Sequence, residues 1–154
     1  MWANIGKGFE HHVTLLQQAF EEKSDVVCIQ EPWTGHNSRT QSHPGFDLYT
    51  PVDNWGNDDL TLREKERPRV LTYVRRGAGL KTQQKRPVQS RDLLWVEVNG
   101  FSILNVYRIS IPGEMDEMDY VIGLQPLGNC LVGGDLNAQV FFAKVPSSSK
   151  KVVW

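Results

Sequence analysis

The sequence lacks the features that mark several common protein classes. It has two cysteines among 154 residues, too few for a disulfide framework or a cysteine-rich zinc site. No apolar stretch approaches the ~20 residues that a membrane span needs, and no signal peptide opens the chain. We therefore expect an intracellular protein in a reducing compartment, neither secreted nor membrane-bound.

Motifs of nucleotide binding and of serine nucleophiles are absent as well, and the net charge is only −1. That charge is unevenly distributed. Residues 63–91 contain ten basic and two acidic residues, a net charge of +8, which leaves −9 for the rest of the chain. The pattern predicts either a basic patch that faces a polyanion or a solvated surface of mixed charge, because clustering in sequence need not be clustering in space.

The spacing of apolar residues predicts two helices. In the first, apolar positions step by three and four residues, at Phe9, Val13, Leu16 and Phe20. This is the period of an amphipathic helix, here over residues 9–23. Its adjacent histidines, His11 and His12, are expected at the surface or edge. A second helix is expected over residues 114–124, with acids near its start as the helix dipole favours.

Short apolar runs rich in β-branched residues predict the strands. They cover residues 25–30, 46–50, 69–75, 93–98, 101–107 and 129–134, after a first strand that ends near Asn4. Asn99-Gly100 predicts a tight hairpin between two of these strands. No regular element is expected over residues 140–154. The order of helices and strands favours a mixed α/β sandwich over a purely parallel sheet.

Two apolar runs end abruptly in acidic or amide residues, in the segments 28–33 (CIQEPW) and 133–138 (GGDLNA). Open α/β sheets place their sites at such carboxyl ends of strands. Glu31 in the first segment suits Mg²⁺, which binds one or two carboxylates and keeps several waters. Glu31 would instead be structural if it capped a loop or paired with Arg39.

Asp135 and Asn137 lie two residues apart, so on an extended segment both side chains would project to the same side. A carboxylate there can orient or deprotonate a water while the amide holds a phosphate oxygen. The same residues also favour an Asp-x-Asn turn. Asn4 and Tyr107 close two further strands; the Tyr107 phenol suits a phosphate contact, or simply packs half-buried with a solvated hydroxyl.

Four stretches together resemble the endonuclease/exonuclease/phosphatase superfamily, which has the DNase I-like fold. They are WANIGK (2–7), IQEPW (29–33), ILNVYR (103–108) and GGDLNA (133–138). They occur in the family's order and cover residues 1–139. Within the superfamily, the chain most resembles the apurinic-type endonuclease domain of fungal non-LTR retrotransposons. The resemblance implies a DNase I-like α/β sandwich that acts on DNA in the nucleus, next to a reverse transcriptase region in a longer parent polyprotein.

The resemblance also assigns roles to individual residues. Glu31 resembles the divalent-metal ligand, with Mg²⁺ or Mn²⁺ as cofactor, and Asn4 the amide near the scissile phosphate. Tyr107 resembles the phosphate-contacting tyrosine. Asp135 resembles the acid that orients or deprotonates the attacking water, and Asn137 its partner amide. The reaction implied is metal-assisted hydrolysis of a DNA phosphodiester.

The chain departs from the family in its last part. The family pattern ends in a Ser-Asp-His-like segment, whereas this sequence has no histidine after His43. Some members also carry an acid where this chain has Gly6. We therefore expect a C-terminally truncated domain over residues 1–139 with an incomplete second sheet, followed by an atypical tail, 140–154, that is disordered or unrelated to the family.

Such a chain is expected to be weakly active or inactive as a nuclease. Two alternatives stay open: a phosphatase of the same superfamily acting on a small phosphoester, and a non-catalytic relic that only binds nucleic acid. The basic segment, with Arg75 and Arg76 as candidate nucleic-acid contacts, favours nucleic acid over a small substrate.

Overall fold

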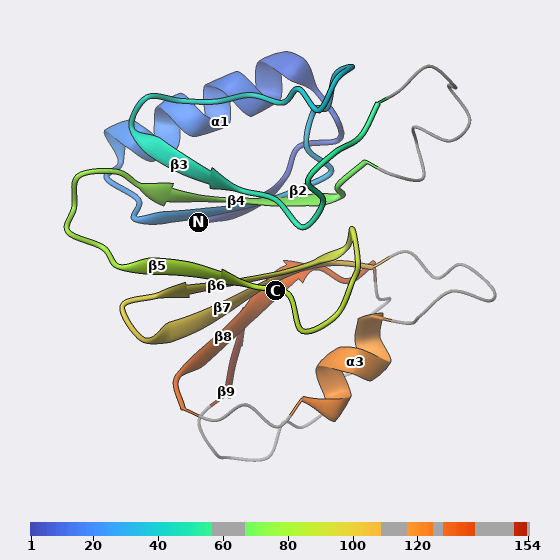
Figure 1. Cartoon of the computed structure of the whole chain (residues 1–154). Coiled ribbons are helices and arrows are strands. Elements are labelled where there is room, and N and C mark those ends of the chain that lie inside the picture. Colours follow the sequence, from blue (N-terminus) through green and yellow to red (C-terminus); the bar gives the residue numbers. More distant parts are fainter. Residues whose placement is uncertain (57–66, 109–116, 125–127, 138–149, 154) are drawn as a thin grey trace.

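The computed structural model describes residues 1–56, 67–108, 117–124, 128–137 and 150–153, which form an α/β protein with two mixed β-sheets (Figure 1). The first sheet has the order β1 (Trp2–Asn4), β2 (Val26–Gln30), β4 (Val70–Arg75), β3 (Phe46–Tyr49). The second has the order β5 (Thr82–Lys85), β6 (Leu93–Val98), β7 (Phe101–Tyr107), β8 (Cys130–Asp135), β9 (Lys150–Val153).

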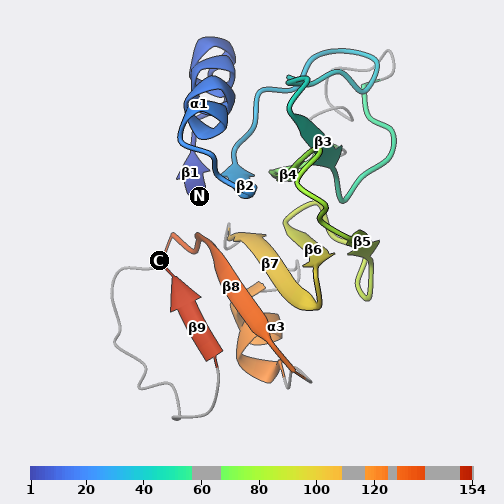
Figure 2. The same ribbon diagram turned by 90° about the vertical axis from the view of Figure 1, so that its left-hand side faces the viewer.

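The sheets lie face to face, with helix α1 (Phe9–Glu21) on the outer side of the first and α3 (Glu117–Gly123) on the outer side of the second (Figures 1 and 2). Buried residues form three clusters that match these layers. Leu16 and Ala19 of α1 pack on the outer face of the first sheet, and Leu104 and Val106 pack near α3. The third cluster, which includes Val70, lies between the sheets. Neither described helix is long and apolar enough to cross a bilayer.

Strand directions bring four strand ends to one edge of the sandwich. Strands β1 and β2 are parallel, with Asn4 opposite Gln30, and β7 and β8 are parallel, with Tyr107 opposite Asp135. Strand β4 runs antiparallel to both β2 and β3. The carboxyl ends of β1, β2, β7 and β8 therefore meet, which is where polar residues follow the apolar runs.

Most predicted elements are present with bounds that differ by a few residues. Strands β6 and β7 have the predicted bounds and pair as the expected hairpin, with Val98 opposite Phe101. Asn99 and Gly100 adopt φ of 48° and 81°, the left-handed pair that a tight two-residue turn requires. Strand β5, Thr-Gln-Gln-Lys, was not predicted because it has no apolar residue. Strand β9 lies in the tail for which no regular element was predicted.

The prediction that His12 lies at the surface or edge is wrong. His12 is fully buried between α1 and the first sheet, with its Nε2 atom 2.9 Å from the hydroxyl oxygen of Tyr73. Burial lowers the pKa of His12 to about 4, so the imidazole is neutral at physiological pH. Its neighbour His11 is exposed, as expected.

One buried amide joins the two sheets. Asn105 of β7 is 0% exposed, and its Nδ2 atom donates to the carbonyl oxygens of Leu71 at 2.9 Å and Ile29 at 3.2 Å in the opposite sheet. Its Oδ1 atom accepts a hydrogen bond from Nε2 of Gln30 at 2.5 Å. Buried amides are costly unless they are hydrogen-bonded, so these contacts favour one relative placement of the sheets.

We expect Asn105→Ala to destabilise the protein by about 2–4 kcal/mol, because it leaves the buried Gln30 amide without its partner and opens a cavity. Urea denaturation followed by circular dichroism measures the change. Gln83→Ala is the matched control: it truncates an exposed amide on β5 and should change the free energy of unfolding by less than about 0.5 kcal/mol. Equal effects of the two substitutions would contradict the role given to Asn105.

Candidate active site

Three polar side chains from different strands converge at the shared edge. The Nδ2 atom of Asn4 lies 3.2 Å from Oε1 of Glu31 and 2.8 Å from Oδ2 of Asp135. The two carboxylate oxygens are therefore within about 6 Å of each other, since both contact the same nitrogen. Glu31 and Asp135 are 104 positions apart in the printed sequence, and β1 is the element that brings them together.

Glu31 is held by its backbone in an unusual conformation. It follows β2 with φ of 47°, in the left-handed region that few residues other than glycine and asparagine adopt. Its N–H donates to the carbonyl oxygen of Arg69 at 2.9 Å, and its own carbonyl accepts from the N–H of Lys7 at 2.8 Å. A non-glycine residue in this region costs on the order of 1–3 kcal/mol, so the surrounding contacts must hold it there.

Tyr107 reaches the site from the second sheet. Its hydroxyl donates to Oε1 of Glu31 at 2.5 Å, and the residue is only 5% exposed. Burial, the hydrogen bond to Glu31 and the negative charge of that carboxylate together raise the pKa of Tyr107 to about 12. The phenol is therefore a neutral hydrogen-bond donor throughout the physiological pH range.

Asp135 and Asn137 form the Asp-x-Asn turn, one of the two geometries that the sequence allowed, and not an extended segment. Strand β8 ends at Asp135, whose Oδ1 atom accepts from the backbone N–H of Asn137 at 2.9 Å. Asn137 has φ of 43°, and its side-chain amide donates to the carbonyl oxygen of Arg108 at 2.7 Å. The same amide lies close enough to the Tyr107 hydroxyl to lower its pKa slightly, so Asn137 belongs to the site but faces β7.

The glycines before Asp135 allow a close approach of β8 to its neighbours. A Cβ atom on Gly133 would lie 2.5 Å from the indole ring of Trp2, and one on Gly134 would lie 1.8 Å from the carbonyl oxygen of Val106. This packing leaves an open hollow at the edge where β1 and β8 meet. Its lining includes Trp2, Asn4, Gln30, Asp135 and Asn137.

The donor set fits a hard divalent cation. Glu31 and Asp135 accept hydrogen bonds from uncharged groups, namely the amide of Asn4, the phenol of Tyr107 and the backbone of Asn137. Among the described residues no cluster of three or more histidine, cysteine or acidic side chains exists. A cation held here would therefore have one or two carboxylate ligands and complete its shell with water, as Mg²⁺ commonly does.

The candidate nucleic-acid contacts Arg75 and Arg76 do not join this site. Strand β4 starts at Val70 opposite Gln30 and carries Arg75 to the other end of the sheet, about 16 Å away at the rise of a strand. There Arg75 donates to carbonyl oxygens at the end of α1, including that of Phe20 at 2.9 Å. Arg76 pairs with Asp47 on β3.

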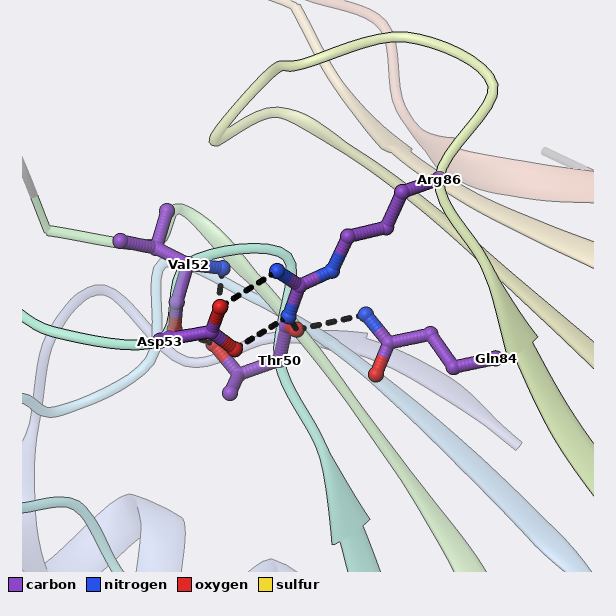
Figure 3. Close-up of polar contacts among 5 residues, drawn as sticks. All are labelled: Thr50, Val52, Asp53, Gln84 and Arg86. Carbon is purple, nitrogen blue, oxygen red and sulfur yellow. Dashed lines mark hydrogen bonds and ion pairs between the residues drawn. The ribbon is translucent and has the colours of Figure 1, made fainter.

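Three of the other described basic residues of segment 63–91 are paired with acids. Ion pairs join Arg69 to Asp92, Lys85 to Glu97 and Arg86 to Asp53. Arg86 binds Asp53 through two nitrogens and also donates to the carbonyl oxygen of Thr50, which Gln84 contacts as well (Figure 3). The described part of the segment thus fits the mixed-charge alternative better than a continuous basic patch.

Sequence reasoning missed the pair Arg69–Asp92, which lies beside the site. Both residues are buried, and the Arg69 guanidinium lies 5.7 Å from the centre of the Tyr107 ring. The available signal was a charged residue directly before each of two strongly apolar strands. Such residues usually face solvent, so that signal alone does not distinguish a buried ion pair from a surface one.

No protein-family model matches the chain, and no curated protein matches it. The resemblance carried by the four motifs therefore stays an interpretation of the sequence. What the structure shows is local: Asn4, Glu31, Tyr107 and Asp135 meet at one edge of a two-sheet sandwich.

The pKa of Tyr107 makes its contribution to stability depend on pH. An unfolded tyrosine titrates near 10, whereas folded Tyr107 titrates at about 12. Its stabilising contribution is therefore fully present below pH 10 and is lost as the pH rises toward 12. Between pH 9 and about pH 11.5 we expect wild type to lose about 2 kcal/mol more free energy of unfolding than Tyr107→Phe.

Urea denaturation at the two pH values measures this difference, with Tyr120→Phe as a matched tyrosine control. Tyr120 accepts a hydrogen bond from the Trp95 indole at 3.0 Å, away from both carboxylates. A Tyr107→Phe variant whose stability changes with pH as the wild type's does would contradict the raised pKa.

Proposed function

We propose that this protein is a divalent-metal-dependent phosphodiesterase that hydrolyses DNA, built on a DNase I-like sandwich of the retrotransposon endonuclease type. One observation carries the proposal: a single amide, that of Asn4, bridges Glu31 and Asp135 beside the Tyr107 phenol. Two carboxylates held about 6 Å apart or closer, with neutral donors around them, can share the tasks of binding a cation and activating a water.

The residues divide the chemistry between them. Glu31 would hold Mg²⁺ or Mn²⁺, which when bound stabilises charge on the phosphate and on the leaving oxygen. Asp135, anchored through one oxygen by the Asn137 backbone, would orient the attacking water and take its proton. The neutral Tyr107 phenol can donate to a phosphate oxygen in place of Glu31. Asn4, which donates to both carboxylates, would hold them at a fixed separation.

The same site is expected to work slowly. All four histidines lie at or before position 43, and the one nearest the core, His12, is buried against Tyr73 and neutral. No imidazole lies among the residues described at the site, so none can donate a hydrogen bond to a bound phosphate. Losing one preorganised donor of this kind commonly costs about 2.7–4 kcal/mol in the transition state, or roughly a hundred- to thousandfold in rate.

A second candidate function is hydrolysis of a small phosphoester. The pairing of Arg69, Lys85 and Arg86 with carboxylates favours it, because a long polyanion needs unpaired positive charge along its path. The open hollow beside Asp135 is also accessible to a small substrate. A non-catalytic role in nucleic-acid binding has less support, since the described basic residues are mostly engaged within the protein.

The experiment combines metal binding with substrate comparison. Purified chain is titrated with Mn²⁺, followed by electron paramagnetic resonance, and then assayed with supercoiled plasmid, bis(p-nitrophenyl) phosphate and p-nitrophenyl phosphate. We expect slow, metal-dependent nicking of plasmid. Glu31→Gln should weaken Mn²⁺ binding by at least the roughly 10–100-fold typical of metal-site substitutions and reduce nicking to the metal-free level. Asp135→Asn should abolish nicking with a smaller loss of binding.

Glu21→Gln is the matched control, because Glu21 is an exposed acid on α1 that accepts a hydrogen bond from Gln17, away from the site. Hydrolysis of p-nitrophenyl phosphate without nicking would select the phosphatase alternative. Nicking that survives Glu31→Gln, or Mn²⁺ binding that is the same in all three variants, would refute the proposed site.

A further inference from the structure

We propose that the buried pair Arg69–Asp92 is a positioning device that holds Tyr107 against Glu31. The inference rests on the proposed function for its catalytic consequence, but its structural claim can be tested without any activity. Neither residue contacts the open hollow, and neither is needed to bind a cation. Their proposed role is to fix two residues that do form the site.

The backbone contacts of the pair reach both residues directly. The carbonyl oxygen of Arg69 accepts the N–H of Glu31 at 2.9 Å, and the carbonyl oxygen of Asp92 accepts the N–H of Tyr107 at 2.9 Å. Glu31 and Tyr107 are therefore each hydrogen-bonded to one member of the pair. A shift of Arg69 relative to Asp92 would move Glu31 relative to Tyr107.

The side chains of the pair cross from one sheet to the other. Arg69 directly precedes β4 of the first sheet, and Asp92 directly precedes β6 of the second. Their contact is bidentate, from Nε and Nη2 of Arg69 to the two carboxylate oxygens. With side chains only 11% and 5% exposed, the pair resists sliding, because a planar guanidinium satisfies a carboxylate in few orientations.

The Tyr107 ring lies against this pair. The Arg69 guanidinium carbon is 5.7 Å from the ring centre, within the range of a cation–π contact. Tyr107 is thus fixed at its backbone by Asp92, at its ring by Arg69 and at its hydroxyl by Glu31. These three contacts orient the phenol hydroxyl toward the carboxylate of Glu31.

Stability alone is a poor explanation for the pair. Replacing a buried ion pair as a unit by apolar residues of similar size is often neutral or stabilising, whereas removing one partner is strongly destabilising. The double replacement Arg69→Met with Asp92→Leu therefore separates positioning from folding. It keeps the side-chain volume roughly constant and leaves no unpaired charge, but it removes the bidentate guanidinium–carboxylate contact between the two sheets.

The test places 3-fluorotyrosine at position 107 and records its ¹⁹F resonance in wild type, in the double variant and in Glu31→Gln. Glu31→Gln supplies the signature of a weakened phenol–carboxylate contact. We expect the double variant to fold cooperatively, with a ¹⁹F resonance shifted or broadened toward that of Glu31→Gln. With plasmid substrate, kcat should fall about 10- to 100-fold while KM changes little, as for misplacement of a reacting group.

The matched control is the pair Arg86–Asp53, which is also a bidentate arginine–aspartate contact but lies between the loop after β3 and β5 (Figure 3). Arg86→Met with Asp53→Leu should leave the ¹⁹F resonance and kcat as in wild type. A folded Arg69→Met/Asp92→Leu protein with the wild-type resonance would overturn the proposal, whether or not the wild type nicks DNA.

If the double variant does not fold, Arg69→Lys decides, because it keeps a buried cation but loses the planar fork. Its ¹⁹F resonance should move in the same direction as in Glu31→Gln; an unchanged resonance would overturn the proposal. Absence of nicking by wild type would refute the proposed function only, since the resonance reports the position of Tyr107 by itself.

Discussion

The buried contact between Gln30 and Asn105 is the constraint on which the rest of the sandwich depends. Apolar surfaces can slide over one another at little cost, but a buried amide must keep its partners. Asn105 contacts the side chain of Gln30 and backbone oxygens on two neighbouring strands, so it fixes both the distance and the register of the sheets. Glu31 and Tyr107, one residue after Gln30 and two after Asn105, meet because Gln30 and Asn105 do.

Three of the polar links between the sheets surround the site: Gln30 with Asn105, which is almost fully buried, then Arg69 with Asp92, and finally Glu31 with Tyr107 at the edge. The innermost link sets the register and the outermost carries the proposed chemistry. Because the region around Asp135 and Glu31 is acidic, a phosphate group approaching it would be repelled until a cation neutralises the carboxylates. Under the proposed function, the cation therefore binds before or together with the substrate.

The sequence was sufficient to predict elements whose signal is local. Helix α1 and the Asn99-Gly100 turn each depend on a few neighbouring residues, and both are present. Of the four apolar positions that predicted α1, however, only Leu16 is buried, and the helix packs through His12, Leu16 and Ala19. The polar ends of two apolar runs predicted that Glu31 and Asp135 belong to one site, although β2 and β8 lie in different sheets and only the packing of the sheets brings these residues together. The family resemblance stays a prediction, because matching motifs do not by themselves establish a shared structure.

Most of what the sequence left unpredicted or open depends on a partner distant in sequence. Strand β5 is polar and becomes a strand because β6 lies beside it. His12 can be buried between α1 and the first sheet because the hydroxyl of Tyr73 on β4 is its hydrogen-bond partner. Part of the positive segment is paired with acids such as Asp53 and Asp92, and the sequence does not show which acids lie close to it in space. Asn137 could equally have been extended, and the turn prevailed because Asp135 accepts its N–H.

The left-handed backbone at Glu31 determines which substitutions would be favoured at this position if the carboxylate were no longer needed. Glycine and asparagine adopt such a conformation with less strain than glutamate does, so replacing Glu31 by either relieves part of the cost of holding that backbone. While the carboxylate is needed, selection opposes this change; once it is not, mutation and folding stability favour the same substitution. A lineage that ceases to use this site would therefore lose the Glu31 carboxylate early and retain a stable sandwich.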